Sequence, residues 1–202
     1  MSSVAKGNAF EDRVFAAVKL ELAGDRLGLS PRLGRAFKKK GYYSSDRDSD
    51  IVVDISIEVW LPGADQWSML WVCECKDYSG AIPVDDVEEF KAKLDQISGA
   101  NRKGVVAVTG AVQVSALNYA RSQGIGIVRI LPDDQVVHLL YHMTIDMVNE
   151  TQELDTKEFS RALTQPAFVA TNRDFYATAE GYIFGDWYSL LRKALSSDAP
   201  KP

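Results

Sequence analysis

The chain has 202 residues, 46% of them apolar and 25% charged, and a formal net charge of −5, which is the composition of a soluble globular protein with one sizeable core. No apolar stretch is long enough to span a bilayer and no apolar signal core follows Met1, so we expect a cytoplasmic protein without membrane contact. The two cysteines, Cys73 and Cys75, are too few for a four-cysteine metal site, and the negative charge argues against broad affinity for nucleic acid.

The first predicted element is an amphipathic helix over residues 9–22. Asn8 is its candidate N-cap, and Glu11 follows three positions later, which is the spacing of a capping box. Residues 37–43 fit either a short strand or a continued helix, and residues 44–50 form a polar loop.

Two strands rich in Ile, Val and Trp follow, over residues 51–60 and 68–76, with a hairpin connection at residues 61–65. The chain then alternates between helices and short apolar strands. These are a helix over 85–98 with Asp85 as its N-cap, a strand over 105–108, a helix over 115–123 and a strand over 125–131. Such alternation predicts an α/β fold with some parallel strands.

The pattern weakens after residue 132. Residues 136–147 are strand-like, residues 159–163 and 187–195 are helical, and we expect the tail from 196 to 202 to be disordered. We therefore predict an α/β core over residues 1–132 and a C-terminal α+β extension over residues 133–202, which packs on the core or forms an interface.

The tripeptide Glu74-Cys75-Lys76 ends the second apolar strand and carries the central functional hypothesis. Alternate side chains of a strand share a face, so Glu74 and Lys76 point the same way. If the hairpin turn is centred near residues 63–64, Asp54 lies roughly opposite Glu74 and its neighbour Cys73, and Asp50 lies roughly opposite Lys76.

These groups have a chemical use together. Asp54, Glu74 and the main-chain carbonyl of Cys75 offer three oxygens to a hard cation such as Mg²⁺, which stabilises charge on a phosphate and lowers the pKa of a bound water. Lys76 would position or activate that water, or offset charge in the transition state. The alternative is a cross-strand ion pair on an exposed face with no catalytic role.

The order and spacing of these segments resemble the PD-(D/E)xK nuclease superfamily and, within it, the restriction-endonuclease-like branch related to Mrr. The resemblance covers residues 7–131 and is carried by Gly7-Asn8-Ala9-Phe10-Glu11, Asp54 in its apolar strand, Glu74-Cys75-Lys76-Asp77-Tyr78, and the segments 84–90, 104–109 and 116–125. It implies a restriction-endonuclease-like αβββαβ core, in which helices flank a central mixed sheet.

The resemblance also implies roles for individual residues. In that family the first acid and the Glu of Glu-x-Lys bind the metal and the lysine assists attack by water, which assigns Asp54, Glu74 and Lys76, with Mg²⁺ as cofactor and Mn²⁺ as its substitute. The literal Pro-Asp is absent, so Asp50 is the alternative first acid; we favour Asp54 because it lies within the strand opposite Glu74. Glu11 resembles a first-helix acid that supports the metal through water, and its capping-box role is an equal alternative.

A basic segment is the candidate contact with DNA phosphates. Its members are Arg32, Arg35, Lys38, Lys39 and Lys40, and no acid lies between residues 31 and 43. A solvated turn is the alternative reading of the lysines. The Gly-Ile-Gly-Ile sequence at residues 124–127 lacks the glycine-rich phosphate fingerprint, so we expect no nucleotide cofactor.

The sequence thus predicts a Mg²⁺-dependent endonuclease that hydrolyses DNA phosphodiester bonds, of the restriction, defence or DNA-processing type. One active site cuts one strand, so cleavage of both strands requires a homodimer or two successive events. One alternative is a catalytically inactive nuclease-like domain that binds protein or DNA, which the seven acids in residues 133–158 favour. Another is an unrelated α/β enzyme, which predicts a deep pocket away from the Glu-x-Lys strand.

Overall fold

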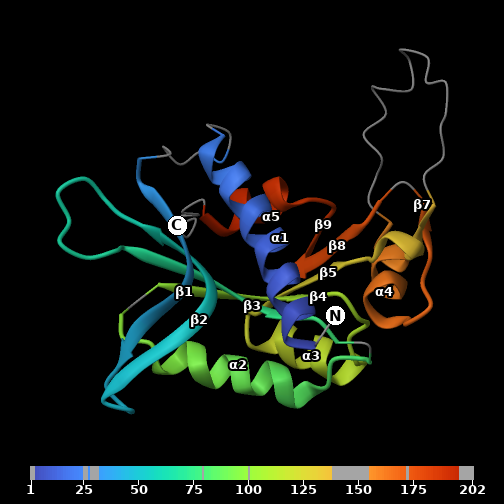
Figure 1. Cartoon of the computed structure of the whole chain (residues 1–202), viewed down its shortest axis with the longest axis horizontal. Helices are drawn as coiled ribbons and strands as arrows, with labels where there is room; N and C mark the ends of the chain where they lie inside the picture. Colours follow the sequence, from blue (N-terminus) through green and yellow to red (C-terminus); the bar gives the residue numbers. More distant parts are fainter. Residues whose placement is uncertain are drawn as a thin grey trace.

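The centre of the molecule is a seven-stranded mixed sheet. The computed structural model describes residues 3–24, 27, 32–78, 80–99, 101–137, 155–171 and 173–195. The strands are β1 (Gly34–Ser44), β2 (Ser49–Val59), β3 (Met69–Lys76), β4 (Arg102–Val108), β5 (Gly126–Ile130), β8 (Phe175–Ala179) and β9 (Tyr182–Phe184), in the order β1-β2-β3-β4-β5-β8-β9 (Figure 1). Only the β3–β4 and β4–β5 neighbours are parallel. This is the α/β class with a mixed sheet that the alternating pattern predicts.

Helices cover both faces of the sheet, because each strand in its middle is apolar on both sides. The helices are α1 (Ser3–Ala23), α2 (Val84–Gln96), α3 (Val114–Ser122), α4 (Thr156–Thr164) and α5 (Trp187–Leu195). One core joins α1 and α5 to the sheet and contains Val14, Trp71 and Leu190. The other joins α2, α3 and α4 to the opposite face and contains Phe90 and Phe159 (Figure 1).

Strand β2 contributes to both cores, and its N-terminal half diverges from β3. Ile55 lies in the core under α1, whereas Ile51 and Val53 lie in the core beside α2. Pairing of β2 with β3 ends at Ile55 and Cys73, while pairing with β1 continues to the end of both strands. The two strands therefore form a fork, and Asp54 is the first β2 residue beyond it.

Strands β8 and β9 extend the same sheet but are not among the elements predicted from the sequence. Phe175 of β8 pairs with Ile130 of β5, and Phe175, Tyr176 and Ala177 are buried. These strands are short, and β8 joins the sheet by pairing with β5 while β9 joins it by pairing with β8, so no local pattern marks them. Two further short strands, β6 (Val136–Val137) and β7 (Ala170–Thr171), form a separate parallel pair.

Three predicted boundaries are wrong. Helix α1 begins at Ser3, so Asn8 is an interior residue and the capping box with Glu11 does not form. Because no proline interrupts residues 3–8, the helix extends on the N-terminal side of the predicted cap at Asn8. Helix α2 begins at Val84 without a side-chain cap, and Asp85 lies in its first turn instead. The polar loop shrinks to residues 45–48, because residues 49 and 50 belong to β2.

The other predicted elements are confirmed within a few residues. Residues 37–43 are part of β1, which excludes the continued helix, and α5 has the predicted bounds. Of the strand-like segment 136–147 only β6 is described, and residues 138–147 and the tail 196–202 lie outside the described residues. Within the described ranges, every helix is too short or too polar to cross a membrane.

Candidate active site

The side chain of Asp54 is fixed at the fork between β2 and β3. The main-chain N–H of Cys75 donates a hydrogen bond of 2.8 Å to Oδ2 of Asp54. In a continued ladder this N–H would face a β2 carbonyl, but β2 leaves β3 after Ile55, so the carboxylate takes the place of a main-chain acceptor. Asp54 is therefore held directly beside the Glu74-Cys75-Lys76 segment.

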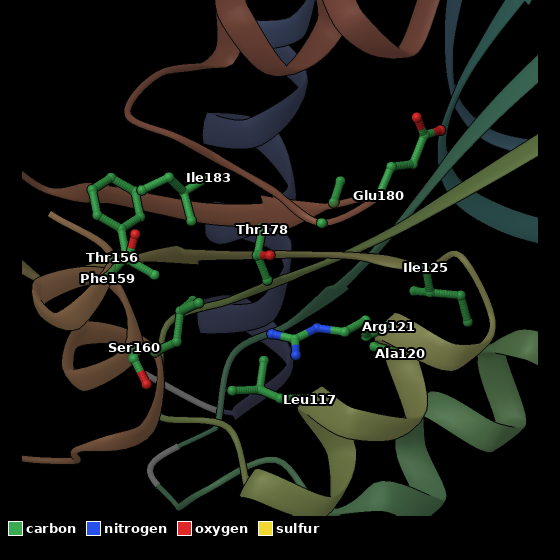
Figure 2. Close-up of a pocket in the computed structure, with 13 residues that line it drawn as sticks. Leu117, Ala120, Arg121, Ile125, Thr156, Phe159, Ser160, Thr178, Glu180 and Ile183 are labelled. Atoms are coloured by element: carbon green, nitrogen blue, oxygen red, sulfur yellow. The ribbon is translucent and has the colours of Figure 1, made fainter. Parts of the chain in front are cut away.

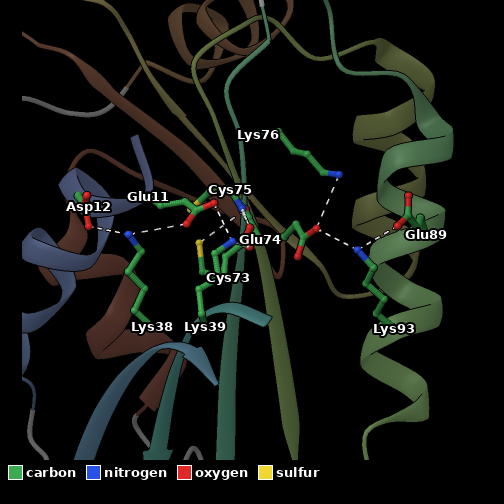
Figure 3. Close-up of polar contacts among 11 residues, drawn as sticks. Glu11, Asp12, Lys38, Lys39, Cys73, Glu74, Cys75, Lys76, Glu89 and Lys93 are labelled. Atoms are coloured by element: carbon green, nitrogen blue, oxygen red, sulfur yellow. Dashed lines mark hydrogen bonds and ion pairs between the residues drawn. The ribbon is translucent and has the colours of Figure 1, made fainter. Parts of the chain in front are cut away.

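Glu74 and Lys76 point together toward the α2 face of the sheet, as strand alternation predicts (Figure 3). Oε1 of Glu74 lies 3.7 Å from Nζ of Lys76 and 3.1 Å from Nζ of Lys93 on α2. Lys76 also lies 3.6 Å from Oδ1 of Asp86, and Lys93 lies 2.9 Å from Oε1 of Glu89. Alternating charges therefore connect the end of β3 to α2.

Burial governs the ionisation of these groups. It raises the pKa of Glu74 above its usual value, and the neighbouring charge of Asp54 adds to the rise, while Lys93 and Lys76 oppose it only in part. Burial by itself would lower the pKa of Lys76, but the attraction of Glu74 and other neighbouring groups outweighs it, and the pKa lies above its usual value. Lys76 is therefore an ammonium ion at neutral pH.

A second charged cluster lies on the α1 face. Nζ of Lys39 on β1 lies 2.5 Å from Oδ1 of Asp54. It also lies 2.8 Å from Oε1 of Glu11 on α1 (Figure 3). Glu11 is buried, and its Oε2 has no hydrogen-bond partner among the described residues. Burial by itself would lower the pKa of Lys39, but the hydrogen bonds to Asp54 and Glu11 raise it above its usual value. Lys39 thus places a full positive charge between two carboxylates.

The backbone of Lys39 is irregular. Its φ of 52° lies in the left-handed region, where a residue with a Cβ atom costs about 1–2 kcal/mol. The register of β1 with β2 passes from Lys38 to Lys40 without a partner for Lys39, opposite Asp54. Consecutive strand residues normally point to opposite faces, but here both Lys38 and Lys39 reach Glu11.

The donor set suits a hard divalent cation. The oxygens available are the carboxylates of Asp54, Glu11 and Glu74 and the carbonyl of Cys75, and Mg²⁺ commonly takes one or two carboxylates and keeps its waters. Oε2 of Glu11, which accepts no hydrogen bond from a described residue, is a further acceptor at this position. In the part of the chain that the structure describes, no three His, Cys, Asp or Glu side chains gather closely enough to ligate one ion, since Glu74 and Glu11 lie on opposite faces of the sheet.

The thiol of Cys75 adds no ligand to this set. Its pKa is raised above its usual value by the hydrogen bond with Cys73 and by burial, and the charges of Asp54 and Glu11 act in the same direction. A protonated thiol is a poor metal ligand. The main-chain carbonyl of Cys75 is therefore the only group of this residue that suits a hard cation.

Asp50 does not reach this site. It is exposed, and its partner across the ladder is Tyr43 of β1. The expectation that Asp50 lies opposite Lys76 is wrong, because pairing between β2 and β3 stops at Ile55. Of the two candidate first acids, Asp54 is the one that contacts the Glu-x-Lys segment.

The five basic residues assigned to DNA phosphates lie on or beside β1. All three lysines form ion pairs with acids of the protein itself. Lys38 pairs with Asp12 at 2.6 Å, and Lys39 pairs with Glu11 and Asp54. Lys40 pairs with the buried Glu58 at 2.5 Å. Arg35 stacks over the ring of Trp60 at 4.8 Å. Arg32 is exposed and forms no ion pair with a described residue. The fold therefore neutralises much of the basic segment.

Sequence reasoning missed two residues of the site, Lys93 and Asp86. The spacing of Glu89 and Lys93 along α2 is the signal that the sequence offers, and it predicts a pair on the surface of one helix. Contact with β3 arises only when α2 packs on the sheet, so no local pattern reports it.

A cleft of about 1250 Å³ opens beside the end of β3. Asp77 and Tyr78, which follow Lys76 directly, line it together with Arg13 of α1. A separate pocket of about 80 Å³ lies among α3, α4 and the β8–β9 turn, with Arg121 and Phe159 in its wall (Figure 2). This second pocket has room for only a few water molecules and is not the deep pocket that an unrelated α/β enzyme would need away from β3.

The fold and the site define a class of protein, an α/β domain in which an aspartate at the end of a hairpin meets a Glu-x-Lys strand. The family Mrr_cat, described as a restriction endonuclease, matches residues 28–140, more than half of the chain. The chain therefore belongs to this restriction endonuclease family, which confirms the resemblance drawn from the motifs. The matched range includes Asp54, Glu74 and Lys76, whereas Glu11 precedes it. No curated protein and no solved structure matches the chain at a significant level.

Proposed function

We propose that this protein is a divalent-metal-dependent endonuclease that hydrolyses phosphodiester bonds in DNA. One observation carries the proposal: the N–H of Cys75 holds Asp54 beside a Glu-x-Lys strand in a chain of the restriction endonuclease family. Mg²⁺ is the proposed metal, with Mn²⁺ as a substitute, because the available ligands are hard oxygens.

Asp54 and Glu74 would hold the metal, with the carbonyl of Cys75 as a third oxygen and Glu11 as support from α1. A divalent cation at this position stabilises charge on a phosphate and lowers the pKa of a bound water. Glu74 suits this role because its ionised form lacks full compensation from Lys93 and Lys76, as its raised pKa indicates. A cation beside it would supply the missing compensation.

Lys76 acts in this proposal as a cation rather than as a base. Its raised pKa keeps the ammonium protonated at neutral pH, so it does not remove a proton from water. Its side chain is only 12% exposed, and ion pairs with Glu74 and Asp86 orient it. An ammonium held in this way stabilises negative charge that develops on a phosphate in the transition state. The cleft lined by Asp77 and Tyr78, which follow Lys76 directly in the chain, is where we would place the DNA backbone.

Plasmid nicking by the pure protein in Mg²⁺ or Mn²⁺ tests this function. We expect metal-dependent nicking that is lost in Glu74→Ala and falls by about 10²-fold or more in Lys76→Ala. Lys91→Ala is the matched control, because Lys91 is a lysine of α2 that pairs with Asp95 on the same helix and does not contact Glu74. Circular dichroism checks that each variant is folded. Absence of nicking by folded protein in both metals would contradict the proposal.

The second candidate is a nuclease-like domain that binds protein or DNA without cleaving it. The ion pairing of Lys38, Lys39 and Lys40 with the protein's own acids favours the protein-binding form of this candidate, because these cations are not free for DNA phosphates. Such a domain would bind no divalent metal, and its affinity for DNA would not depend on Lys76. Calorimetric titration with Mn²⁺ separates the two functions.

A further inference from the structure

Lys39 occupies the position between Glu11 and Asp54. Its ammonium bridges a carboxylate from α1 and a carboxylate from β2, at 2.8 Å and 2.5 Å, and so takes the place of a cation shared by the two acids. Direct contact between two carboxylates that lack such a cation would be repulsive. The protein therefore contains its own counter-ion at the α1 end of the site.

The backbone is adapted to place this ammonium. Lys39 adopts a left-handed conformation opposite Asp54, at the one position where the register of β1 with β2 is interrupted. Strained residues of this kind persist where the surrounding structure holds them, and they are concentrated at functional sites. Regular alternation would have turned Lys39 away from the face that Lys38 occupies. The irregularity is what brings Lys39 to the two acids.

One ammonium leaves this pair of acids incompletely compensated. Glu11 and Asp54 together carry two negative charges, and Oε2 of Glu11 is buried with no hydrogen-bond partner among the described residues. Lys38 lies 3.8 Å from that oxygen but is bound at 2.6 Å to Asp12. The side chain of Lys39 is 47% exposed, so it can move into solvent without repacking the core. A divalent cation would bring two charges where Lys39 brings one.

We propose that Lys39 is a built-in competitor of the divalent metal, which must displace its ammonium from Glu11 and Asp54. In the metal-free protein Lys39 keeps the two acids together and lowers their affinity for a cation. The inference rests on the proposed metal-dependent function, and it concerns Lys39 alone. It assigns this lysine to the control of metal binding in place of the phosphate contact expected from the sequence.

Calorimetric titration with Mn²⁺ alone, without DNA, tests the inference on the full chain. We expect Lys39→Met to bind Mn²⁺ about tenfold more tightly than the wild-type protein, since a competing positive charge has been removed. Lys39→Gly removes the same ammonium and also accepts the left-handed backbone, so it guards against a variant that fails to fold. Both variants should show the same gain.

Lys38→Met is the matched control, because it removes an equal charge near Glu11 without opening the bridging position. It should change the affinity for Mn²⁺ by less than about threefold. An equal gain in Lys38→Met would show that net charge alone is responsible and would overturn the inference. Unchanged or weaker binding by both Lys39 variants, with wild-type protein that binds Mn²⁺, would overturn it and leave the proposed function standing. Absence of Mn²⁺ binding in every form would overturn both.

Discussion

Oε1 of Glu74 lies 3.1 Å from Nζ of Lys93, closer than the 3.7 Å that separates it from Lys76 on its own strand. Helix α2 therefore supplies the nearest cation to the proposed metal ligand. Even with both lysines present, burial keeps the pKa of Glu74 above its usual value. The site therefore contains a carboxylate whose ionised form is less favourable in the folded protein than in water.

This arrangement predicts that Glu74→Gln stabilises the metal-free protein while it removes activity. The folded state binds the Glu74 proton more tightly than the unfolded state, so stability falls as pH rises above the usual pKa of glutamate. The gain in Tm should therefore be absent at about pH 4 and largest at neutral pH. Thermal unfolding of both proteins across this pH range measures it.

Glu89→Gln is the matched control, because Glu89 shares Lys93 with Glu74 but is exposed. Its hydrogen bond from Lys93 lowers the pKa of Glu89, so its contribution to stability is present at neutral pH and is lost as pH falls through the lowered pKa. This variant should show no gain in Tm at neutral pH. A gain in Glu89→Gln equal to that in Glu74→Gln would contradict the burial argument.

The fork between β2 and β3 predicts different roles for the two candidate first acids. Asp54→Asn should reduce metal-dependent nicking by about 10²-fold or more, because the carboxylate beside Cys75 loses its charge. Asp50→Asn should keep wild-type nicking within about threefold, since Asp50 is exposed and faces β1. Initial nicking rates at saturating Mg²⁺ compare them, and the reverse ranking would assign the metal to Asp50.

We expect Lys40 to contribute to stability and Arg32 to contribute to DNA binding, because only Lys40 forms an ion pair with a described acid. Glu58 is 1% exposed and binds Lys40 together with the hydroxyl of Tyr42, so Lys40→Met should lower the free energy of unfolding by about 2 kcal/mol. Arg32→Met should leave stability unchanged and weaken binding to DNA, because its exposed guanidinium is available to a phosphate. Urea unfolding and fluorescence anisotropy with a labelled duplex measure the two effects. Equal loss of DNA affinity in both variants would favour a shared phosphate contact.

Arg129 on β5 predicts a stability effect remote from the site. It is 1% exposed and faces no carboxylate among its hydrogen-bond partners, which are the main-chain carbonyls of Thr109, Ala162, Gln165 and Pro166 and the side chain of Gln135. Burial lowers the pKa of Arg129, but it remains a cation.

Arg129→Met would remove the guanidinium donor from the buried carbonyl of Ala162 and from the partly buried carbonyl of Gln165 at the end of α4. We expect a loss of about 3 kcal/mol or more in the free energy of unfolding, measured by urea denaturation, with faster amide exchange in α4. Arg192→Met on the exposed side of α5 is the control and should cost less than about 0.5 kcal/mol. A small loss in Arg129→Met would show that water replaces the guanidinium at α4.

Prediction from sequence succeeded where the signal is local. The apolar runs of β2 and β3, the hairpin between them and the terminal helix α5 follow from residue type and period over a few positions. It failed at α1, where the helix passes the predicted cap at Asn8, and at β8, which depends on β5 for its pairing. Propensity decides an element only where packing does not override it.

The sequence by itself determined the α/β class, the Glu74-Cys75-Lys76 segment and the side-chain alternation that sends Glu74 and Lys76 to one face. Only the tertiary structure shows that Asp54, rather than Asp50, contacts the Glu-x-Lys segment, because the point where β2 leaves β3 depends on pairing between distant segments. It also decided that Lys39 meets Glu11 and Asp54, since a left-handed residue in β1 and the packing of α1 bring together groups that lie 28 and 15 positions apart. Strand periodicity is a property of neighbours along the chain, whereas a charged site is a property of neighbours in space.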